Sequence, residues 1–252
     1  MRPVRKGISP IQGDFSKYED AKQYLVSHLA LYCSYCERRV MTNLAVEHIE
    51  PKGGDFGKPK LEKKWSNFLL ACVNCNSSKG SREVLFYNLF LPDRDNTFYA
   101  FEYTADGVIK ARETLSYTNK ARANITLKLL GLDKALRKTL NENDKQIALD
   151  KRSQRMEVWG TAEMALEDYK SASTVLAVKN QIVENMKANG FFSVWMTVFE
   201  DYSEMKNLFI DSIQGTRESG CFDEEGNSKT FHPNEDELEG GGKVWNSSIY
   251  RF

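Results

Sequence analysis

Two cysteine pairs constrain this chain more than any other feature of its sequence. Cys33 and Cys36 form one Cys-x-x-Cys pair, and Cys72 and Cys75 form another. Each pair can turn tightly enough to point two thiolates at one ion, and four thiolates are the ligand set of a closed structural zinc site. A redox role would account for one pair but not for two. We therefore predict a single zinc ion held by all four cysteines.

The N-terminus and the overall hydropathy indicate the cellular compartment of the protein, and the compartment decides the chemical state of its cysteines. The opening "MRPVRKGISPIQGDF" has no apolar signal segment, and no window holds the roughly 18 unbroken apolar residues of a membrane span. We expect a cytoplasmic protein with no membrane partner. In a reducing compartment, paired cysteines are more often metal ligands than disulfides.

The residues between the two pairs are more than a simple zinc ribbon requires. Residues 37–71 exceed the roughly 15–20 residues of such a ribbon, and they contain "VEHIEP". Phosphodiester hydrolysis needs a base to activate water and a divalent ion to neutralise charge on the phosphate. Glu47 and Asn76 offer the oxygen donors that Mg²⁺ prefers. Both can face His48 if the fold brings the two cysteine pairs together. Neutral imidazole suits the base.

At these residues the sequence resembles a known nuclease family. The pattern C-x-x-C … EHIEP … W-x-N … C-x-x-C-N-x-x-K-G is similar to that of HNH endonucleases with the ββα-metal fold. The resemblance implies that Glu47 and Asn76 bind the catalytic ion, that His48 is the general base, and that Asn67 braces the loop bearing His48. The family often has Asp before the base and His at the last position. Glu and Asn keep oxygen donors there, which favours Mg²⁺ or Mn²⁺ over zinc or nickel.

A closer resemblance extends over most of the chain. It rests on six stretches: "MRPVRKG", "YCSYCERR", "TNLAVEHIEPK", "NFLLACVNCNSSKG", "LPDRDNTF" and "GFFSVWMTVF". They are similar to the HNH subunits of Septu-type and retron-associated anti-phage systems, the PtuB family. This implies a toxic nuclease effector in a bacterial cytoplasm. Its implied partners are an ABC/SMC-like ATPase, PtuA, and in some systems a reverse transcriptase with its multicopy single-stranded DNA.

The periodicity predicts an α+β protein with two regions. Residues 1–117 would form the HNH module with its four-cysteine zinc site. In this module we expect a helix that begins with a Ser16–Glu19 capping box, short strands, and a β-hairpin over residues 97–113 with its turn at Asp106-Gly107. Residues 118–252 would form a mainly helical region that docks a partner or regulates the module. There we expect a helix over residues 172–188 and a single helix over residues 191–213, then an irregular acidic tail.

The charges are balanced overall but not locally. Lys+Arg and Asp+Glu both number 35, whereas residues 31–82 hold nine basic and five acidic residues. Four basic side chains are candidate phosphate contacts: Lys63, Lys64, Lys79 and Arg82. Such contacts would make nucleic-acid affinity salt-dependent, although an ordinary solvated face would have the same composition.

Two classes of function fit this sequence. One is a metal-dependent nuclease, and the other is a non-catalytic zinc module that binds nucleic acid or a partner. The set of Glu47, His48 and Asn76 favours the nuclease, because a binding module does not need it. An HNH site attacks the phosphodiester without using a 2′-hydroxyl, which favours DNA. An RNA substrate such as tRNA is the alternative.

Overall fold

The computed structural model describes residues 1–133 and 142–233, and the last part of the predicted acidic tail lies outside the described residues. Its helices and strands follow in chain order: α1 (Lys22–Leu29), β1 (Ala45–His48), β2 (Phe68–Ala71), α2 (Val73–Lys79), α3 (Thr97–Ala100), β3 (Phe101–Tyr103), β4 (Ile109–Ala111), α4 (Tyr117–Leu130), α5 (Glu142–Ala172), α6 (Leu176–Asn189), α7 (Phe192–Val198) and α8 (Ser203–Ser212). Within the described ranges, no helix is both long and apolar enough to cross a membrane.

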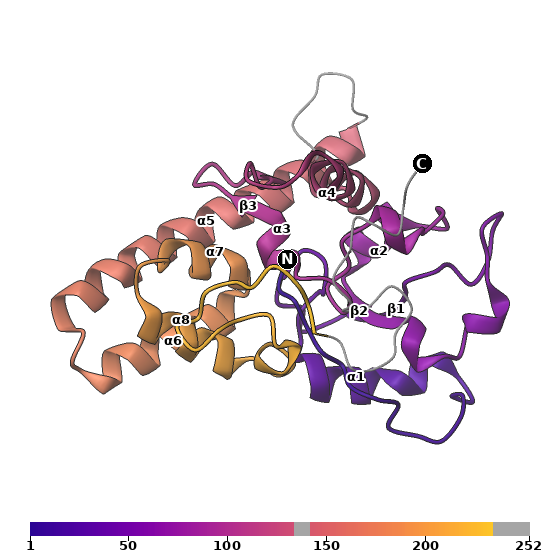
Figure 1. Ribbon diagram of the computed structural model, residues 1–252, viewed down its shortest axis with the longest axis horizontal. Coiled ribbons are helices and arrows are strands. Elements are labelled where there is room, and N and C mark those ends of the chain that lie inside the picture. The colour runs from indigo at the N-terminus through magenta and orange to yellow at the C-terminus, as the bar shows by residue number, and fades with distance from the viewer. Residues whose placement is uncertain (134–141, 234–252) are drawn as a thin grey trace.

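The first sheet and the helix that follows it form a compact ββα unit. β1 and β2 pair antiparallel, with Ala45 opposite Ala71 and His48 opposite Phe68. α2 starts directly after β2, with Cys72 as its N-cap residue. In Figure 1, α1 lies on one side of this two-stranded ribbon and α2 on the other. Successive side chains of a strand point to opposite faces, so the ribbon presents neighbouring residues of β1 to two different environments.

The predicted hairpin is confirmed from Phe101 to Ala111, but its first four predicted residues, Thr97–Ala100, form the helix α3. The predicted capping box is not found. β3 and β4 pair antiparallel around the Asp106-Gly107 turn, with Tyr103 opposite Ile109. The first helical segment is a 3₁₀ turn, Tyr18–Ala21, that leads into α1. The residues before these two segments make no side-chain cap. The tight first turn starts beyond Ser16, so the serine is too early in the chain to serve as N-cap.

The last apolar stretch forms two helices where the sequence predicts one. α7 and α8 are separated by a turn at Phe199–Tyr202, where the Tyr202 N–H donates to the Phe199 carbonyl over 3.0 Å. The Phe199 and Phe209 rings meet edge to face at 5.2 Å. The turn thus lets the apolar faces of two short helices pack together. Similarly, the helix predicted over 172–188 begins later, because α5 runs to Ala172 and α6 starts at Leu176.

The N-terminal segment and the chain beyond α8 pack together. The Arg2 guanidinium donates to the Thr216 hydroxyl over 2.6 Å and to the Leu29 carbonyl over 2.8 Å. The Asn96 amide donates to the Cys221 and Lys229 carbonyls over 3.1 and 2.6 Å. The described part of the predicted acidic tail is therefore irregular, as expected, but anchored. One continuous set of buried apolar residues extends on both sides of the predicted boundary near residue 117.

Candidate active site and metal centre

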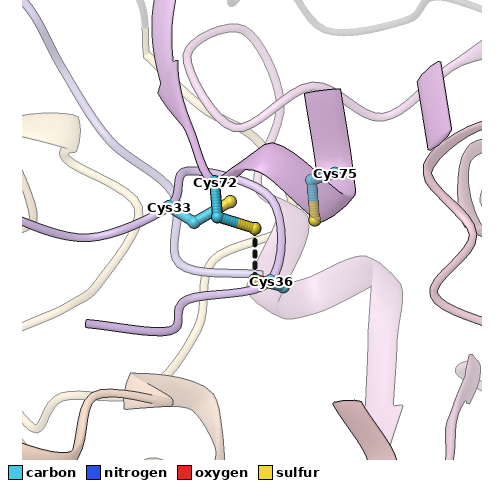
Figure 2. Close-up of side chains that lie close together, drawn as sticks. All are labelled: Cys33, Cys36, Cys72 and Cys75. Atoms are coloured by element: carbon cyan, nitrogen blue, oxygen red, sulfur yellow. Dashed lines mark hydrogen bonds between the residues drawn. The ribbon is translucent and has the colours of Figure 1, made fainter. Parts of the chain in front are cut away.

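The four paired cysteines come together in one cluster (Figure 2). Cys33 and Cys36 lie in the turn after α1, and Cys72 and Cys75 lie at the start of α2. Their sulfur atoms all lie within 4.8 Å of one another, and the Cys36 and Cys72 sulfurs are 3.7 Å apart. A tetrahedral zinc with bonds of about 2.3 Å places its sulfurs about 3.8 Å apart. The cluster therefore has the dimensions of a four-thiolate zinc site.

The chemistry of the cluster also fits a cation. All four thiols are buried. Burial raises the pKa of Cys33, whereas hydrogen bonds from Cys33, Cys36 and Cys75 lower the pKa of Cys72. Buried thiolates need a positive charge among them, which zinc supplies. Cys221 is buried elsewhere, and burial raises the pKa of that thiol to about 12.

The turn that holds Cys33 and Cys36 is joined to the helical region through Glu37. This residue follows Cys36, and its side chain is buried. Its carboxylate accepts hydrogen bonds from the Ser193 N–H over 3.0 Å and the Ser193 hydroxyl over 2.5 Å. Its backbone carbonyl accepts a hydrogen bond from the Phe191 N–H over 3.0 Å. A carboxylate at the first turn of α7 is electrostatically favourable. Nothing in the local sequence pattern signals this contact.

Glu47 points from β1 toward α2 and meets Lys79. The two side chains are 1% and 3% exposed, and the Lys79 Nζ lies 3.0 Å from the Glu47 Oε1. The Tyr35 hydroxyl also donates to that oxygen over 3.4 Å. Burial raises the pKa of Glu47 to about 7, against the opposing effect of the Lys79 ammonium. Lys79, predicted as a phosphate contact, is thus held inside the unit by an ion pair.

Asn76 lies on α2, the helix that meets β1 through the Lys79–Glu47 pair. It precedes Lys79 by three residues on α2, so both side chains lie on one helix face. The Asn76 side chain is half-buried and makes no hydrogen bond among the described residues. A buried carboxylate and an amide oxygen on facing elements are a donor set that suits Mg²⁺ or Mn²⁺. In this structure, the Lys79 ammonium supplies the positive charge beside Glu47.

His48 leaves β1 on the other face, toward Tyr18 and the segment that leads into α1. The expectation that Glu47 faces His48 is therefore wrong, because successive side chains of a strand point to opposite faces. Its ring packs edge-on against Tyr18 and Phe68, with centroids 4.8 and 5.3 Å away. Its Nε2 lies 2.9 Å from the backbone carbonyl of Glu62. Because a carbonyl only accepts, Nε2 carries the proton and Nδ1 keeps its lone pair. Burial lowers the pKa of His48, and the nearby Lys52 charge acts in the same direction. The imidazole is therefore neutral and basic at Nδ1.

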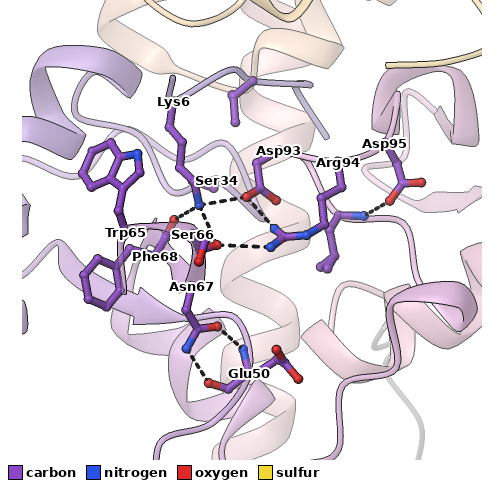
Figure 3. Close-up of polar contacts among 12 residues, drawn as sticks. Lys6, Ser34, Glu50, Trp65, Ser66, Asn67, Phe68, Asp93, Arg94 and Asp95 are labelled. Atoms are coloured by element: carbon purple, nitrogen blue, oxygen red, sulfur yellow. Dashed lines mark hydrogen bonds and ion pairs between the residues drawn. The ribbon is translucent and has the colours of Figure 1, made fainter. Parts of the chain in front are cut away.

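Asn67 holds the backbone just beyond His48. Its Oδ1 accepts from the Glu50 N–H over 2.8 Å, and its Nδ2 donates to the Glu50 carbonyl over 2.9 Å (Figure 3). The same Nδ2 donates to the Leu61 carbonyl over 3.3 Å. These bonds join both ends of the segment that connects β1 to β2. They also place the Glu62 carbonyl, the partner of His48, next to a residue that Asn67 fixes.

A buried polar cluster holds the backbone on both sides of Asn67 (Figure 3). The Lys6 Nζ donates to the Ser66 and Phe68 carbonyls over 3.0 and 2.7 Å, and lies 3.0 Å from Asp93. Arg94 donates to the Ser66 carbonyl over 3.1 Å and to Asp93 over 2.6 Å. Both carbonyls flank Asn67. The stretches "MRPVRKG" and "LPDRDNTF" thus meet at one place, which sequence analysis did not assign.

The three other basic residues predicted as phosphate contacts have different surroundings. Arg82 donates to the Lys79 and Leu129 carbonyls over 3.1 and 2.6 Å, so it joins the ends of α2 and α4. Lys64 pairs with Asp14 over 2.7 Å at the surface. Lys63 is exposed, with no ion pair in the described part of the chain.

Comparison with known proteins agrees with this geometry. Residues 33–82 match the HNH endonuclease family, and this range contains both cysteine pairs, the ββα unit and its polar residues. The chain therefore carries an HNH endonuclease domain, followed by a mainly helical region.

A particular relative comes from Vibrio cholerae serotype O1 biovar El Tor, where it is a candidate HNH endonuclease of retron Vc95. It is 29% identical over 109 residues, which cover 40% of this chain and 52% of the relative. The match thus spans about half the length of that protein.

Proposed function

We propose that this protein is a metal-dependent endonuclease that hydrolyses phosphodiester bonds of nucleic acid. The observation that carries the proposal is the state of His48. Its Nε2–H is bound to the Glu62 carbonyl, and burial of the ring lowers its pKa, which favours the neutral form. That leaves Nδ1 as a base at the end of the strand that also carries Glu47. A zinc module that only binds would have no use for an imidazole oriented in this way at the end of a strand whose preceding residue is a buried carboxylate.

The residues of the unit divide the work of hydrolysis. His48 takes a proton from the attacking water at Nδ1 and holds its own proton at Nε2. Glu47 and Asn76 would hold Mg²⁺ or Mn²⁺, which when bound neutralises charge that develops on the phosphate. Asn67 positions His48 indirectly, because it fixes the backbone at Glu50 and Leu61. The four cysteines would hold a zinc ion, which would fix the turn of Cys33 and Cys36 against α2.

The proposed substrate is DNA, and the proposed setting is anti-phage defence. Attack by an activated water does not use a 2′-hydroxyl, so a ribose is not needed. The name of the Vibrio relative links it to a retron, which supports a role as toxic effector of the PtuB type. In that role the protein would work with an ABC/SMC-like ATPase, PtuA, and with a reverse transcriptase and its multicopy single-stranded DNA where a retron is present.

We further propose that residues 118–252 dock the ATPase. The support lies around the connection between α5 and α6, where Met164 and Leu176 are each 66% exposed and Val175 is 46% exposed. The connection between α5 and α6 lies away from the ββα unit in Figure 1. A docked partner there could restrain or position the nuclease through the Glu37–Ser193 contact.

The direct test is cleavage by the full chain. The purified protein is incubated with labelled DNA and with total RNA in Mg²⁺ or Mn²⁺, with and without its operon neighbours. We expect DNA cleavage that His48→Ala reduces about 10²- to 10⁴-fold. His28→Ala, which changes a half-buried histidine of α1 outside the site, should cleave normally. A folded His48→Ala protein that cleaves at the wild-type rate would contradict the mechanism.

A further inference from the structure

The loop that leaves β1 holds an aromatic side chain out in solvent. Phe56 is 49% exposed. The loop closes on itself next to the site: the Lys58 N–H donates to the Pro51 carbonyl over 2.6 Å, and the Gly57 N–H donates to the Gly54 carbonyl over 3.0 Å. Pro51 lies three residues after His48. The segment between β1 and β2 projects at the right-hand edge of the molecule in Figure 1, opposite α5.

Close backbone packing constrains the loop on both sides of Phe56. A side chain at Gly57 would come within 2.7 Å of the Gly53 backbone, so the two glycines lie in direct contact. Gly54 has a φ of +82°, and a side chain there would come within 2.8 Å of Ser81. Ser81 follows α2, the helix that carries Asn76. The loop is therefore fixed against both the end of β1 and the end of α2. An isolated exposed apolar residue is ordinary, but this one is held in place beside the site.

The segment between β1 and β2 carries five lysines against three acidic residues, one of which, Asp55, directly precedes Phe56. Lys58 pairs with Glu50, and Lys52 pairs with Glu62 over 3.1 Å. Lys60 and Lys63 are exposed and make no ion pair among the described residues. An exposed ring that shares its segment with two exposed lysines fits a nucleic-acid strand, because aromatic rings stack on bases while lysines contact phosphates. A purely apolar protein partner would leave these lysines without a role.

We propose that Phe56 stacks on an unpaired nucleobase near the scissile phosphate, while Lys60 and Lys63 contact phosphates of the same strand. This inference rests on the proposed nuclease function and narrows its substrate to nucleic acid that offers an open base face. A single strand offers such a face along its length, and a duplex offers one at a bulge. A fully paired duplex would have to be unstacked first, which costs free energy.

Binding measured without cleavage tests the proposal. In a His48→Ala background, the affinity of the full chain is measured at one salt concentration for three DNA probes: a mixed-sequence single strand, a duplex with an internal bulge, and the fully paired duplex. Phe56→Ala should weaken binding of the single strand and the bulged duplex roughly 5- to 100-fold. Phe56→Trp should restore it. The salt dependence should stay unchanged in Phe56→Ala, whereas Lys60→Ala and Lys63→Ala should each lower the single-strand salt slope by about 0.7.

The control is Tyr117→Ala, which removes an aromatic ring that is 89% exposed at the start of α4 and should leave all affinities unchanged. Unchanged affinity in Phe56→Ala would overturn the proposal, as would an equal loss on the fully paired duplex. Loss of a co-purifying protein with normal DNA binding would instead assign Phe56 to a protein contact. Failure of the nuclease function shows separately, as absence of cleavage by the protein that retains His48.

Discussion

The HNH domain and the helices that follow it are held together by different forces. In the domain, each strand has four residues and α2 has seven. These elements are joined by the cysteine cluster, the Glu47–Lys79 pair and the hydrogen bonds of Asn67. In the helical region, Trp195, Phe199 and Phe209 pack as a cluster of aromatic rings. Glu47 and the four cysteines are buried, so in the HNH domain metal and polar contacts act within the apolar core that the two regions share.

Removing the metal should affect the two regions most unequally. Purified protein should contain about one tightly bound zinc per chain. Chelation or Cys72→Ser should unfold the HNH domain, because zinc binding by such sites contributes about 10–16 kcal/mol, comparable to the whole stability of a domain. Limited proteolysis should then cut within residues 33–82, while α5 to α8 remain protected.

Cys221→Ser is the matched control, because that cysteine is buried but lies outside the cluster. It should keep its zinc and its resistance to protease. A protein without zinc whose residues 33–82 stay resistant to protease would refute the four-cysteine site.

Weakening the link between the two regions should have a smaller effect. Glu37→Gln keeps the size of the side chain but removes the charge that receives two hydrogen bonds from Ser193. Loss of a charged hydrogen bond at this buried position should lower the free energy of unfolding by about 1.5–3 kcal/mol. In urea unfolding, the domain and the helices should then separate into two transitions.

An exposed glutamate gives the comparison for this variant. Glu167 pairs with Lys170 over 2.8 Å and its side chain is 72% exposed, so Glu167→Gln should change the free energy of unfolding by less than about 1 kcal/mol. Equal stability of the Glu37→Gln and Glu167→Gln proteins would show that Glu37 does not couple the two regions.

Structural features that a few adjacent residues determine could be predicted from the sequence. The two Cys-x-x-Cys pairs predicted the cluster, because each pair forms a local turn. The Asp106-Gly107 turn predicted the hairpin for the same reason. The break between α7 and α8 was missed, because the residues there contain no Gly or Pro that would mark a turn, and the packing of Phe199 on Phe209 joins side chains that are distant in the sequence.

Contacts between distant segments of the chain could not be predicted in the same way. Glu37 meets Ser193, and Lys6 meets Asp93, only after the chain has folded. The ion pair of Glu47 with Lys79 was not predicted either. From the sequence, Glu47 is a candidate metal ligand and Lys79 a candidate phosphate contact. Strand alternation, in contrast, would have shown that Glu47 and His48 leave β1 on opposite faces.

The smallest effect on stability is expected at the predicted docking surface, where the effect on partner binding should be large. Leu176→Asp and Met164→Asp change side chains that are each 66% exposed, so each should alter the free energy of unfolding by less than about 0.5 kcal/mol. A charge within an apolar interface commonly costs more than about 1 kcal/mol of binding, so the double variant should lose the ATPase in co-purification and keep its zinc. Ile8→Asp, at a 78% exposed residue outside residues 118–252, should retain it. The reverse pattern would be an ATPase that binds the double variant but not Ile8→Asp. It would show that the docking surface lies in the N-terminal region and not on the helices.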